Sequence, residues 1–292
     1  MRIGLVTCAK LPEPDPDAPL LHDALVARGH QPVLLAWDGD SGALGRFDRV
    51  LLRSPWNYYR APARFLEWLE GVDREAHVLN PLDVVRWNVH KRYLLELEAR
   101  DLPIVPSCIV ERGATSDVRD IVDKRGWEDV VVKPCISAAS WRTRRFPLGH
   151  ADEAAQYISQ LARDGDVLVQ PFLPGAVEPG ERSLVWVDGV LTHAIRKRPR
   201  FDGQDESVTA DGPPTAQESA LAARILEPVA DRIAYARVDV FPDQRGRPLV
   251  SEVELIEPSL FFRHGPTALA RLVARIERDP PVGAEDTRDP SP

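Results

Sequence analysis

The feature that most constrains the fold of this chain lies near its C-terminal end, where residues 236–241 and 248–257 alternate apolar and acidic side chains. A polar turn that contains glycine separates the two segments, so they predict a hairpin of two strands. Asp239 is flanked by valines, and Glu252 and Glu254 share one face of their strand because side chains alternate with a period of two. Carboxylates gathered in apolar surroundings repel one another unless a cation lies between them.

The acidic face of this hairpin has the composition of a magnesium site. It offers carboxylate oxygens without His or Cys, which suits Mg²⁺ or Mn²⁺, and Mg²⁺ usually shares its ligands with substrate phosphates. The alternative is an amphipathic hairpin with a solvated acidic face. The spacing alone does not decide between them, so the segments upstream are needed.

Composition narrows the class of protein. The chain has 292 residues, 43% of them hydrophobic and 28% charged, and a net charge of -8. This charge argues against binding to nucleic acid or to an acidic membrane. No apolar run approaches about 18 residues, the N-terminus reads as a strand rather than a signal peptide, and the three cysteines are scattered as in a reducing compartment. We therefore expect a cytoplasmic protein of mixed α/β structure.

The first part of the chain alternates strands and helices. Apolar runs at 2–8, 31–37 and 49–53 flank a helical pattern at 20–29, which predicts a small parallel sheet covered by helices. No glycine-rich dinucleotide motif follows the first run, so this lobe is not expected to bind NAD.

A loop at the end of the third strand is a candidate substrate site. Doubly wound sheets place ligand-binding loops at such strand ends, and an arginine there can pair with a substrate carboxylate. We therefore expect Arg53, Ser54 and Trp56 to contact the substrate. The alternative is a loop whose aromatic residues pack on the core and whose arginine is solvated.

Cations recur at the ends of later predicted elements. Asn88 is expected to cap a helix that carries Lys91, and a buried apolar strand ends in Lys133. Arg196 and Lys197 follow a hairpin that turns at Asp-Gly. Each signal is weak, since a lysine at a strand end is more often solvated than functional, and the basic run could equally be a localisation signal.

The order of these segments is more informative than any one of them. A loop of small and polar residues follows Lys133, an apolar segment spans 170–173, and the polar loop 201–214 is a candidate lid. Together they predict a nucleotide site, in which cations hold phosphates, a loop cradles them, an apolar segment faces the base and carboxylates hold metal ions.

In this order the motifs resemble those of the ATP-grasp superfamily, and its glutathione-synthetase-like branch in particular. The resemblance covers about residues 80–272 and rests on Lys91, Val-Val-Lys133-Pro, Gln170-Pro-Phe-Leu, Gly180-Glu-Arg-Ser-Leu-Val, Arg-Val-Asp239 and Glu252-Val-Glu254. It implies an α/β ATP-grasp fold, with a small Rossmann-like parallel-sheet lobe before two α+β lobes that enclose ATP. The implied division is 1–85 for the N-terminal substrate lobe, 86–168 and 169–280 for the two parts of the ATP-grasp domain, and 281–292 for a disordered tail.

The resemblance also implies roles for individual residues. Phosphate contacts fall to Lys91 and Lys133, the backbone of Phe172 and Leu173 would read adenine, and Glu178 or Glu181 would meet the ribose or the base. The implied ATP-binding set is Lys91, Lys133, Ser137, Ser140, Gln170, Phe172, Leu173, Glu178 and Glu181. Asp239, Glu252 and Glu254 would ligate two Mg²⁺ ions, with Mn²⁺ as an alternative metal. Arg196 and Lys197 would face the transferred phosphate and the substrate.

Two positions depart from the pattern of the superfamily. The loop after Lys133 lacks the glycines that many members carry, which puts its closure over phosphate in question. The third metal position is usually Asn and here is Glu254, whose extra charge either tightens metal binding or marks a residue that is not a direct ligand.

The implied reaction converts a carboxylate into an acyl phosphate, which a nitrogen nucleophile then attacks. It needs no covalent enzyme nucleophile, so Cys135 is expected to be a buried structural thiol. Residues 52–58 and 80–88 are further similar to those of the ligases that form D-cycloserine. That similarity implies an amino-acid substrate, O-ureido-D-serine, cyclised by its own ureido nitrogen.

Other functions stay open from the sequence. They are an intermolecular carboxylate–amine ligase, a non-catalytic nucleotide-binding module and a kinase that releases a phosphorylated product. A homodimer is the expected assembly.

Overall fold

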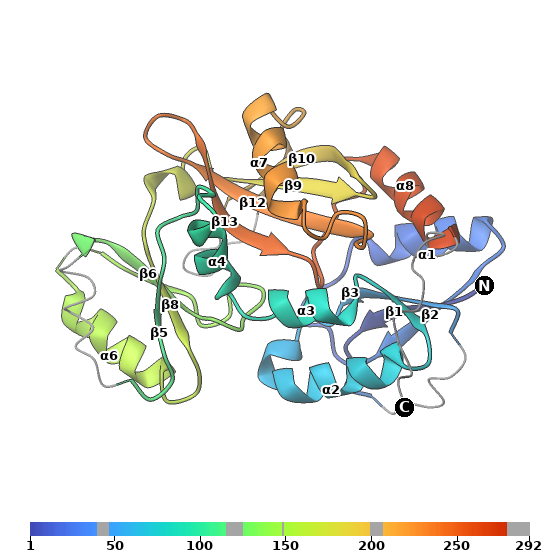
Figure 1. Cartoon of the computed structure of the whole chain (residues 1–292), viewed down its shortest axis with the longest axis horizontal. Coiled ribbons are helices and arrows are strands. Elements are labelled where there is room, and N and C mark those ends of the chain that lie inside the picture. Colours follow the sequence, from blue (N-terminus) through green and yellow to red (C-terminus); the bar gives the residue numbers. More distant parts are fainter. Residues whose placement is uncertain (40–46, 115–124, 148, 199–206, 279–292) are drawn as a thin grey trace, which may run out of the picture.

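The computed structural model describes residues 1–39, 47–114, 125–147, 149–198 and 207–278. Within them the strands form three sheets, one parallel and two antiparallel (Figure 1). The site described below lies where these sheets face one another.

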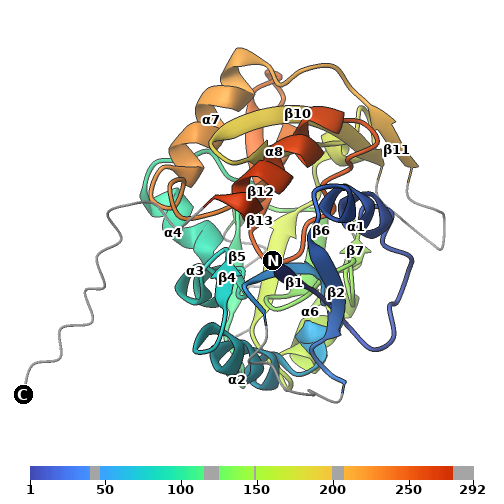
Figure 2. The ribbon, with the colours of Figure 1, turned by 90° about the vertical axis from the view of Figure 1, so that its right-hand side faces the viewer.

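The N-terminal sheet is parallel and has the strand order β2-β1-β3-β4. Its strands are β1 (Arg2–Thr7), β2 (Gln31–Ala36), β3 (Arg49–Ser54) and β4 (His77–Leu79). Apolar side chains pack on both faces: those of α1 (Ala18–Ala27) and the last helix, α8 (Pro266–Glu277), on one, and those of α2 (Pro62–Asp73) on the other (Figure 2). The parallel lobe predicted from the sequence is confirmed.

The second sheet along the chain is antiparallel and has the order β5-β8-β6-β7. Its strands are β5 (Cys108–Val110), β6 (Val130–Pro134), β7 (Arg144–Phe146) and β8 (Val167–Pro171). Helix α6 (Ala151–Leu161) buries Ala154, Ile158 and Leu161 against its valines. This packing fixes β6, which carries Lys133.

The third sheet has five strands in the order β11-β10-β9-β12-β13. They are β9 (Glu181–Val187), β10 (Val190–Arg198), β11 (Ser207–Ala210), β12 (Tyr235–Pro242) and β13 (Pro248–Glu254). The turn between β9 and β10 lies at Asp188 and Gly189, both with positive φ, as the Asp-Gly signal predicts. Helix α7 (Ala216–Leu226) packs on this sheet and begins with a capping box of Thr215 and Glu218.

Asn88 is not the helix cap that the sequence suggests. It is the last residue of α3 (Leu82–Asn88), and the next helix, α4, spans Tyr93–Ala99. Its side-chain amide donates to the carbonyl oxygen of Val253 (2.7 Å) and accepts from the amide of Leu255 (2.8 Å). Asn88 therefore ties the helical segment to β13, and Lys91 lies in the short junction between the two helices.

Two other predictions need revision at the level of elements. The inner boundary predicted between residues 168 and 169 falls inside β8 (Val167–Pro171), which pairs with β6 along its whole length, so a division there would cut a strand. The candidate lid at 201–214 includes β11, which pairs with β10, whereas residues 201–206 lie outside the described residues. The predicted tail at 281–292 also lies outside them.

In the described parts of the chain, every helix is too short or too polar to cross a lipid bilayer.

Candidate active site

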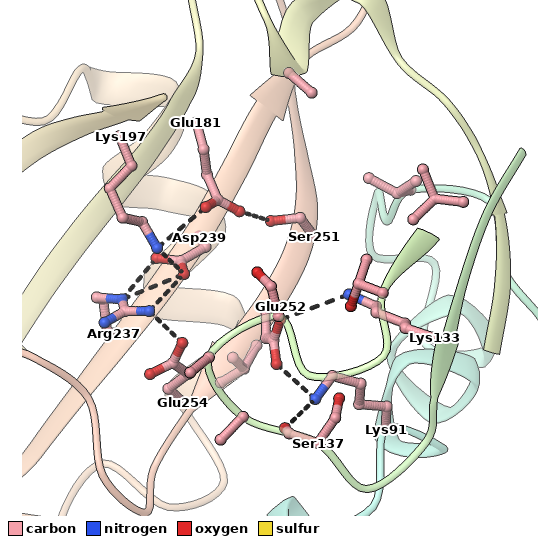
Figure 3. A pocket seen from close by; sticks show the side chains of 18 of the residues that line it. Lys91, Lys133, Ser137, Glu181, Lys197, Arg237, Asp239, Ser251, Glu252 and Glu254 are labelled. Carbon is pink, nitrogen blue, oxygen red and sulfur yellow. Dashed lines mark hydrogen bonds and ion pairs between the residues drawn. The ribbon is translucent and has the colours of Figure 1, made fainter. Parts of the chain in front are cut away.

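A cavity of about 330 Å³ is lined by residues of all three sheets and their loops. The N-terminal lobe contributes Trp56 and Tyr58, and the second sheet (β5 to β8) contributes Lys133 and Gln170. The hairpin β12–β13 contributes its acidic residues. Figure 3 shows how side chains from these separate segments point toward one another.

The acidic hairpin is present as the alternation predicts. Asp239 on β12 lies opposite Glu252 on β13, and Glu254 is two residues further along the same face. All three line the cavity. Among the described residues, however, no three His, Cys, Asp or Glu side chains already converge as a ligand set for a metal ion. The carboxylates are held apart by cations instead.

Glu252 is paired with two lysines from different segments. Its carboxylate lies 2.7 Å from Nζ of Lys91 and 3.6 Å from Nζ of Lys133 (Figure 3). Burial opposes ionisation of Glu252, but the two lysines outweigh it and lower its pKa to about 2. In the same way burial alone would lower the pKa of Lys91, and Glu252 raises it. The structure thus brings together three residues that were predicted from the sequence to belong to one nucleotide site.

Asp239 is the centre of a second charged group. It accepts hydrogen bonds from Lys197 (3.0 Å) and from Nε of Arg237 (2.9 Å), while Lys197 also lies 3.1 Å from Glu181 and Arg237 also binds Glu254. Burial and the neighbouring Arg237 oppose the charge on Lys197, but the carboxylates Asp239 and Glu181 together raise its pKa. Lys197 and Arg237 are therefore each paired with two carboxyl groups of the cavity.

Glu254 differs from the other two carboxylates of the hairpin. Burial raises its pKa to about 7, with further contributions from Asp239 and Glu252 that Arg237 only partly offsets. The cavity therefore holds more carboxyl groups than its own cations neutralise. A set of hard oxygen donors with an excess of negative charge fits a divalent cation such as Mg²⁺, so the residues present are compatible with the predicted metal.

Three further residues predicted for ATP, at the end of β8 and just after it, also line the cavity. Gln170 at the end of β8 is buried and donates to the hydroxyl of Ser107 (2.9 Å), and Phe172 and Leu173 follow it into the cavity wall. The backbone amide of Phe172 donates to the carbonyl oxygen of Asp129 (2.7 Å), so that amide already has a partner within the protein. Leu173 is left as the better candidate for backbone contacts with a base.

The loop after Lys133 adopts a conformation that its lack of glycine would not suggest. Ala139, Ser140 and Arg142 all have φ between 49° and 55°, the left-handed region that glycine usually occupies. Ser137 and Ser140 line the cavity, and the carbonyl of Ser137 accepts a hydrogen bond from Lys91 (2.9 Å). The backbone thus turns as a glycine loop would, although each such residue costs about 1–2 kcal/mol.

Several predicted residues lie elsewhere. Arg53 is 1% exposed and donates to the carbonyl of Pro258 (3.2 Å), with Asp17 3.9 Å away, and Ser54 is buried against Thr7. Neither is among the described residues that line the cavity, whereas Trp56 is. The structure therefore does not place Arg53 and Ser54 in this cavity, because Arg53 joins the N-terminal lobe to the segment after β13 and Ser54 bonds within the lobe.

Arg196 and Glu178 are the other two predicted site residues that do not line the cavity. Adjacent residues of a strand face opposite sides, so Lys197 points into the cavity and Arg196 away from it, 2.5 Å from Asp211. Glu178 is exposed on a loop, and of the two glutamates considered for the ribose or the base it is Glu181 that lines the cavity, with Ser251 2.7 Å away.

Arg237 and Glu257 are charged residues of the site that sequence reasoning did not single out. Arg237 shares a strand face with Asp239, two residues away, and that spacing would have been sufficient to include it. Glu257 also lines the cavity but follows the end of β13, beyond the range in which alternation is informative. Cys135 is buried, and burial, with a smaller contribution from Asp166, raises the pKa of its thiol to about 12, as expected of a structural cysteine.

Comparison with known proteins gives consistent results. Residues 3–80 match the family model described as the N-terminal domain of D-cycloserine synthetase DcsG. The chain is 31% identical to the cycloserine biosynthesis protein DcsG of Streptomyces lavendulae, over 93% of this chain and 97% of that protein. The crystal structure of D-cycloserine synthetase DcsG superposes with a TM-score of 0.85 at 30% identity, covering 94% of this chain and 98% of the other.

A more distant solved structure relates the fold to a wider group of proteins. It is that of the ATP-grasp ligase PsnB complexed with minimal precursor, Mg and ADP, which superposes with a TM-score of 0.61 at 20% identity and covers 94% of this chain and 98% of that one. At this identity the similarity concerns the fold, which is therefore the ATP-grasp fold. Together with the close match along nearly its whole length, it shows that this chain belongs to the DcsG family of ATP-grasp ligases.

Proposed function

We propose that this ATP-dependent ligase activates the carboxylate of O-ureido-D-serine and closes the ring of D-cycloserine. The observation that carries the proposal is Glu252, on which Lys91 and Lys133 converge from two other segments in a cavity that also holds Lys197 and Arg237. A cluster of four cations and a larger number of carboxyl groups is suited to a triphosphate with its metal ions and to an anionic substrate.

The proposed roles follow from the positions of the side chains. Lys91 and Lys133 bind ATP phosphates and exchange their pairing with Glu252 for pairing with the nucleotide. Lys197 and Arg237 offset the charge that builds on the γ-phosphoryl group and orient the substrate carboxylate toward it. Asp239, Glu252 and Glu254 would hold two Mg²⁺ ions, which when bound neutralise phosphate charge and align the transferred group.

The proposed chemistry conserves every atom of substrate and ATP. A substrate carboxylate oxygen attacks the γ-phosphorus and ADP leaves, which gives an acyl phosphate. The nitrogen bonded to the side-chain oxygen attacks the acyl carbon, loses its proton and expels phosphate. The ring nitrogen still carries the carbamoyl group, whose hydrolysis to ammonia and carbon dioxide completes D-cycloserine.

The test is ADP release with Mg²⁺-ATP and O-ureido-D-serine as the only other reactant, with the products identified by mass. We expect stoichiometric ADP and cyclic product without any added amine. ADP release that requires a second amine would identify an intermolecular ligase instead. ATP binding without ADP formation with any substrate would identify a nucleotide-binding module, and a stable phosphorylated product a kinase.

We further propose that Mn²⁺ can replace Mg²⁺ and that the protein is a homodimer. Activity measured against each metal after treatment with a chelator tests the first, and the mass in solution by light scattering tests the second. A monomeric mass would contradict the proposed homodimer and would leave the proposed reaction unaffected.

A further inference from the structure

Glu257 is a buried carboxyl group in the cavity to which the mechanism above gives no role. It follows β13 and is 8% exposed. Its carbonyl oxygen accepts a hydrogen bond from Nε1 of Trp56 (3.1 Å), and its side chain is hydrogen-bonded to the hydroxyl of Tyr58. Both partners belong to the segment that follows β3, where Tyr58 begins a short 3-10 helix (Tyr58–Arg60), so Glu257 lies on the side of the cavity that faces the N-terminal lobe.

The charge environment of Glu257 differs from that of the other acidic residues in the cavity. Glu181, Asp239, Glu252 and Glu254 each form an ion pair with a lysine or arginine of the cavity. Within the described part of the chain, no ion pair within 4.0 Å is found for Glu257. Burial raises its pKa to about 8, with further contributions from Glu254 and Glu252 that the more distant charge of Lys91 only partly offsets. The protein thus provides a buried carboxyl group and leaves its counter-charge to be supplied from outside.

A cationic group lies close to the same segment. Nη1 of Arg237 donates to the carbonyl oxygen of Ser259 (3.3 Å), two residues after Glu257, and Ser259 and Arg237 both line the cavity. The cavity therefore presents a carboxyl group on Glu257 and a guanidinium that is bonded two residues further along the same segment. An α-amino acid presents the complementary pair, an ammonium and a carboxylate on one carbon atom.

We propose that Glu257 binds the α-ammonium group of the amino-acid substrate and so determines that the enzyme accepts amino acids rather than simple carboxylic acids. The inference rests on the proposed function and adds the group that recognises its substrate. The ammonium ion supplies the missing counter-charge, Tyr58 holds the carboxyl group in position, and the substrate carboxylate is thereby directed to Arg237 and Lys197 for phosphorylation.

A different role for the same residue predicts a different result. A carboxyl group in this position can also be imagined as the base that removes the proton from the attacking nitrogen. Loss of a base lowers kcat for every substrate and leaves binding unchanged, whereas loss of an ammonium-binding group weakens binding only of substrates that carry the ammonium.

The experiment compares two ligands in two proteins. The ligands are O-ureido-D-serine and its analogue with hydrogen in place of the amino group, titrated by calorimetry in the presence of Mg²⁺ and a non-hydrolysable ATP analogue. The proteins are wild type and Glu257→Gln, with Glu227→Gln as a matched control, because Glu227 is an exposed glutamate at the end of α7. ADP release with the same ligands is measured in parallel.

We expect wild type to bind O-ureido-D-serine about 10- to 100-fold more tightly than the analogue, the range for a charge-assisted hydrogen bond. In Glu257→Gln that preference should fall to a few-fold, with affinity for the analogue unchanged, and Glu227→Gln should behave as wild type. Equal loss of affinity for both ligands, or loss of kcat without loss of affinity, would overturn the inference while the proposed function stood. Failure of wild type to bind or convert O-ureido-D-serine would overturn both, and binding with the expected preference but without turnover would overturn only the proposed function.

Discussion

At the scale of single residues, Glu252 is the side chain on which the site depends most. Two lysines from separate segments converge on it. When a nucleotide and its metal ions bind, Glu252 would give up these internal ion pairs, the lysines would bind phosphate and Glu252 would bind metal. The same pairs keep three charged groups in a buried cavity of the ligand-free protein, where an unpaired charge is strongly unfavourable.

Replacing Glu252 with Gln tests its role as a metal ligand. The side chain keeps its shape and loses its charge, so we expect turnover to fall by at least about 100-fold, because a lost charge-assisted contact of this kind is worth 3 kcal/mol or more. Circular dichroism should show a folded protein. The measurement is the rate of ADP release as Mg²⁺ is titrated, and a variant with the wild-type Mg²⁺ dependence would remove Glu252 from the metal site.

Glu257 also makes a prediction about stability. In the folded protein its pKa is about 8, above the ordinary 4.5. Between these pH values the folded state holds a proton that the unfolded state has lost, so the free energy of unfolding decreases as pH rises from about 4.5 to 8. The groups that face it are Glu252 and Glu254 of β13, Lys91 and Tyr58.

Substitution of Glu257 by Gln removes that titration. We expect the ligand-free variant to melt several degrees above wild type at pH 8 and to show little difference at pH 5, since each pKa unit corresponds to about 1.4 kcal/mol and each kcal/mol to about 2–4 °C. Melting curves across this range provide the measurement. A variant less stable than wild type at pH 8 would show that Glu257 is ionised and paired in the free protein.

At the scale of elements, the loop 135–143 connects the nucleotide side of the cavity to the N-terminal lobe. Trp141 of this loop packs against Tyr59, with ring centroids 4.7 Å apart. The carbonyl of Arg142 accepts a hydrogen bond from Tyr157 (2.9 Å). These contacts hold a backbone that contains three left-handed residues, so they oppose its relaxation.

Removing the Trp141 ring should loosen the loop over the phosphates. An aromatic pair contributes about 0.5–1.5 kcal/mol, so Trp141→Ala should raise the KM for ATP about 2- to 10-fold with a smaller effect on the KM for the substrate. Tyr59→Phe keeps the ring and is the matched control, with KM values expected to equal those of wild type. An unchanged KM for ATP in Trp141→Ala would mean that the loop is held by its other contacts.

The same elements show which parts of the structure the sequence could predict. The β12–β13 hairpin follows from alternation and a turn signal, both local properties, and so do β6 and the Asp-Gly hairpin. Asn88 was misjudged because its partners lie more than 160 residues away on β13. The left-handed turn at 139–142 carries no glycine signal, so composition gave no indication of it.

Strand periodicity shows that Arg196 and Lys197 cannot both face the cavity, but it does not show which of the two does. Only one of two adjacent residues can face the cavity, and it is the one that pairs with Asp239. Strand periodicity could not predict the position of the Arg53 side chain, because its burial depends on how the lobes pack rather than on any local pattern.

At the scale of the whole molecule, Asp17 and Arg53 join the N-terminal lobe to the segment after β13. Asp17 accepts the backbone amides of residues 260–262 at 2.6–2.9 Å, and Arg53 binds the carbonyl of Pro258 and lies over the ring of Tyr235. This junction sets the position of Glu257 and Ser259 relative to the loop that carries Trp56.

Arg53→Ala should therefore act on stability. Loss of a buried hydrogen-bonded charge beside Asp17 is expected to lower the free energy of unfolding by about 2–4 kcal/mol, measured by denaturant titration. Any change in KM should be similar for ATP and substrate, since the side chain does not line the cavity. A selective rise in the substrate KM without loss of stability would return Arg53 to the substrate site.

The central claim is that the carboxylate of the substrate becomes an acyl phosphate, and isotope transfer tests it most directly. O-ureido-D-serine labelled with ¹⁸O in both carboxylate oxygens is incubated with Mg²⁺-ATP and the enzyme, and the released phosphate is analysed by mass spectrometry. The account predicts one ¹⁸O atom in each phosphate and one in each cyclic product. Phosphate without label, formed at the same rate as ADP, would contradict it, because ATP would then have been hydrolysed by water.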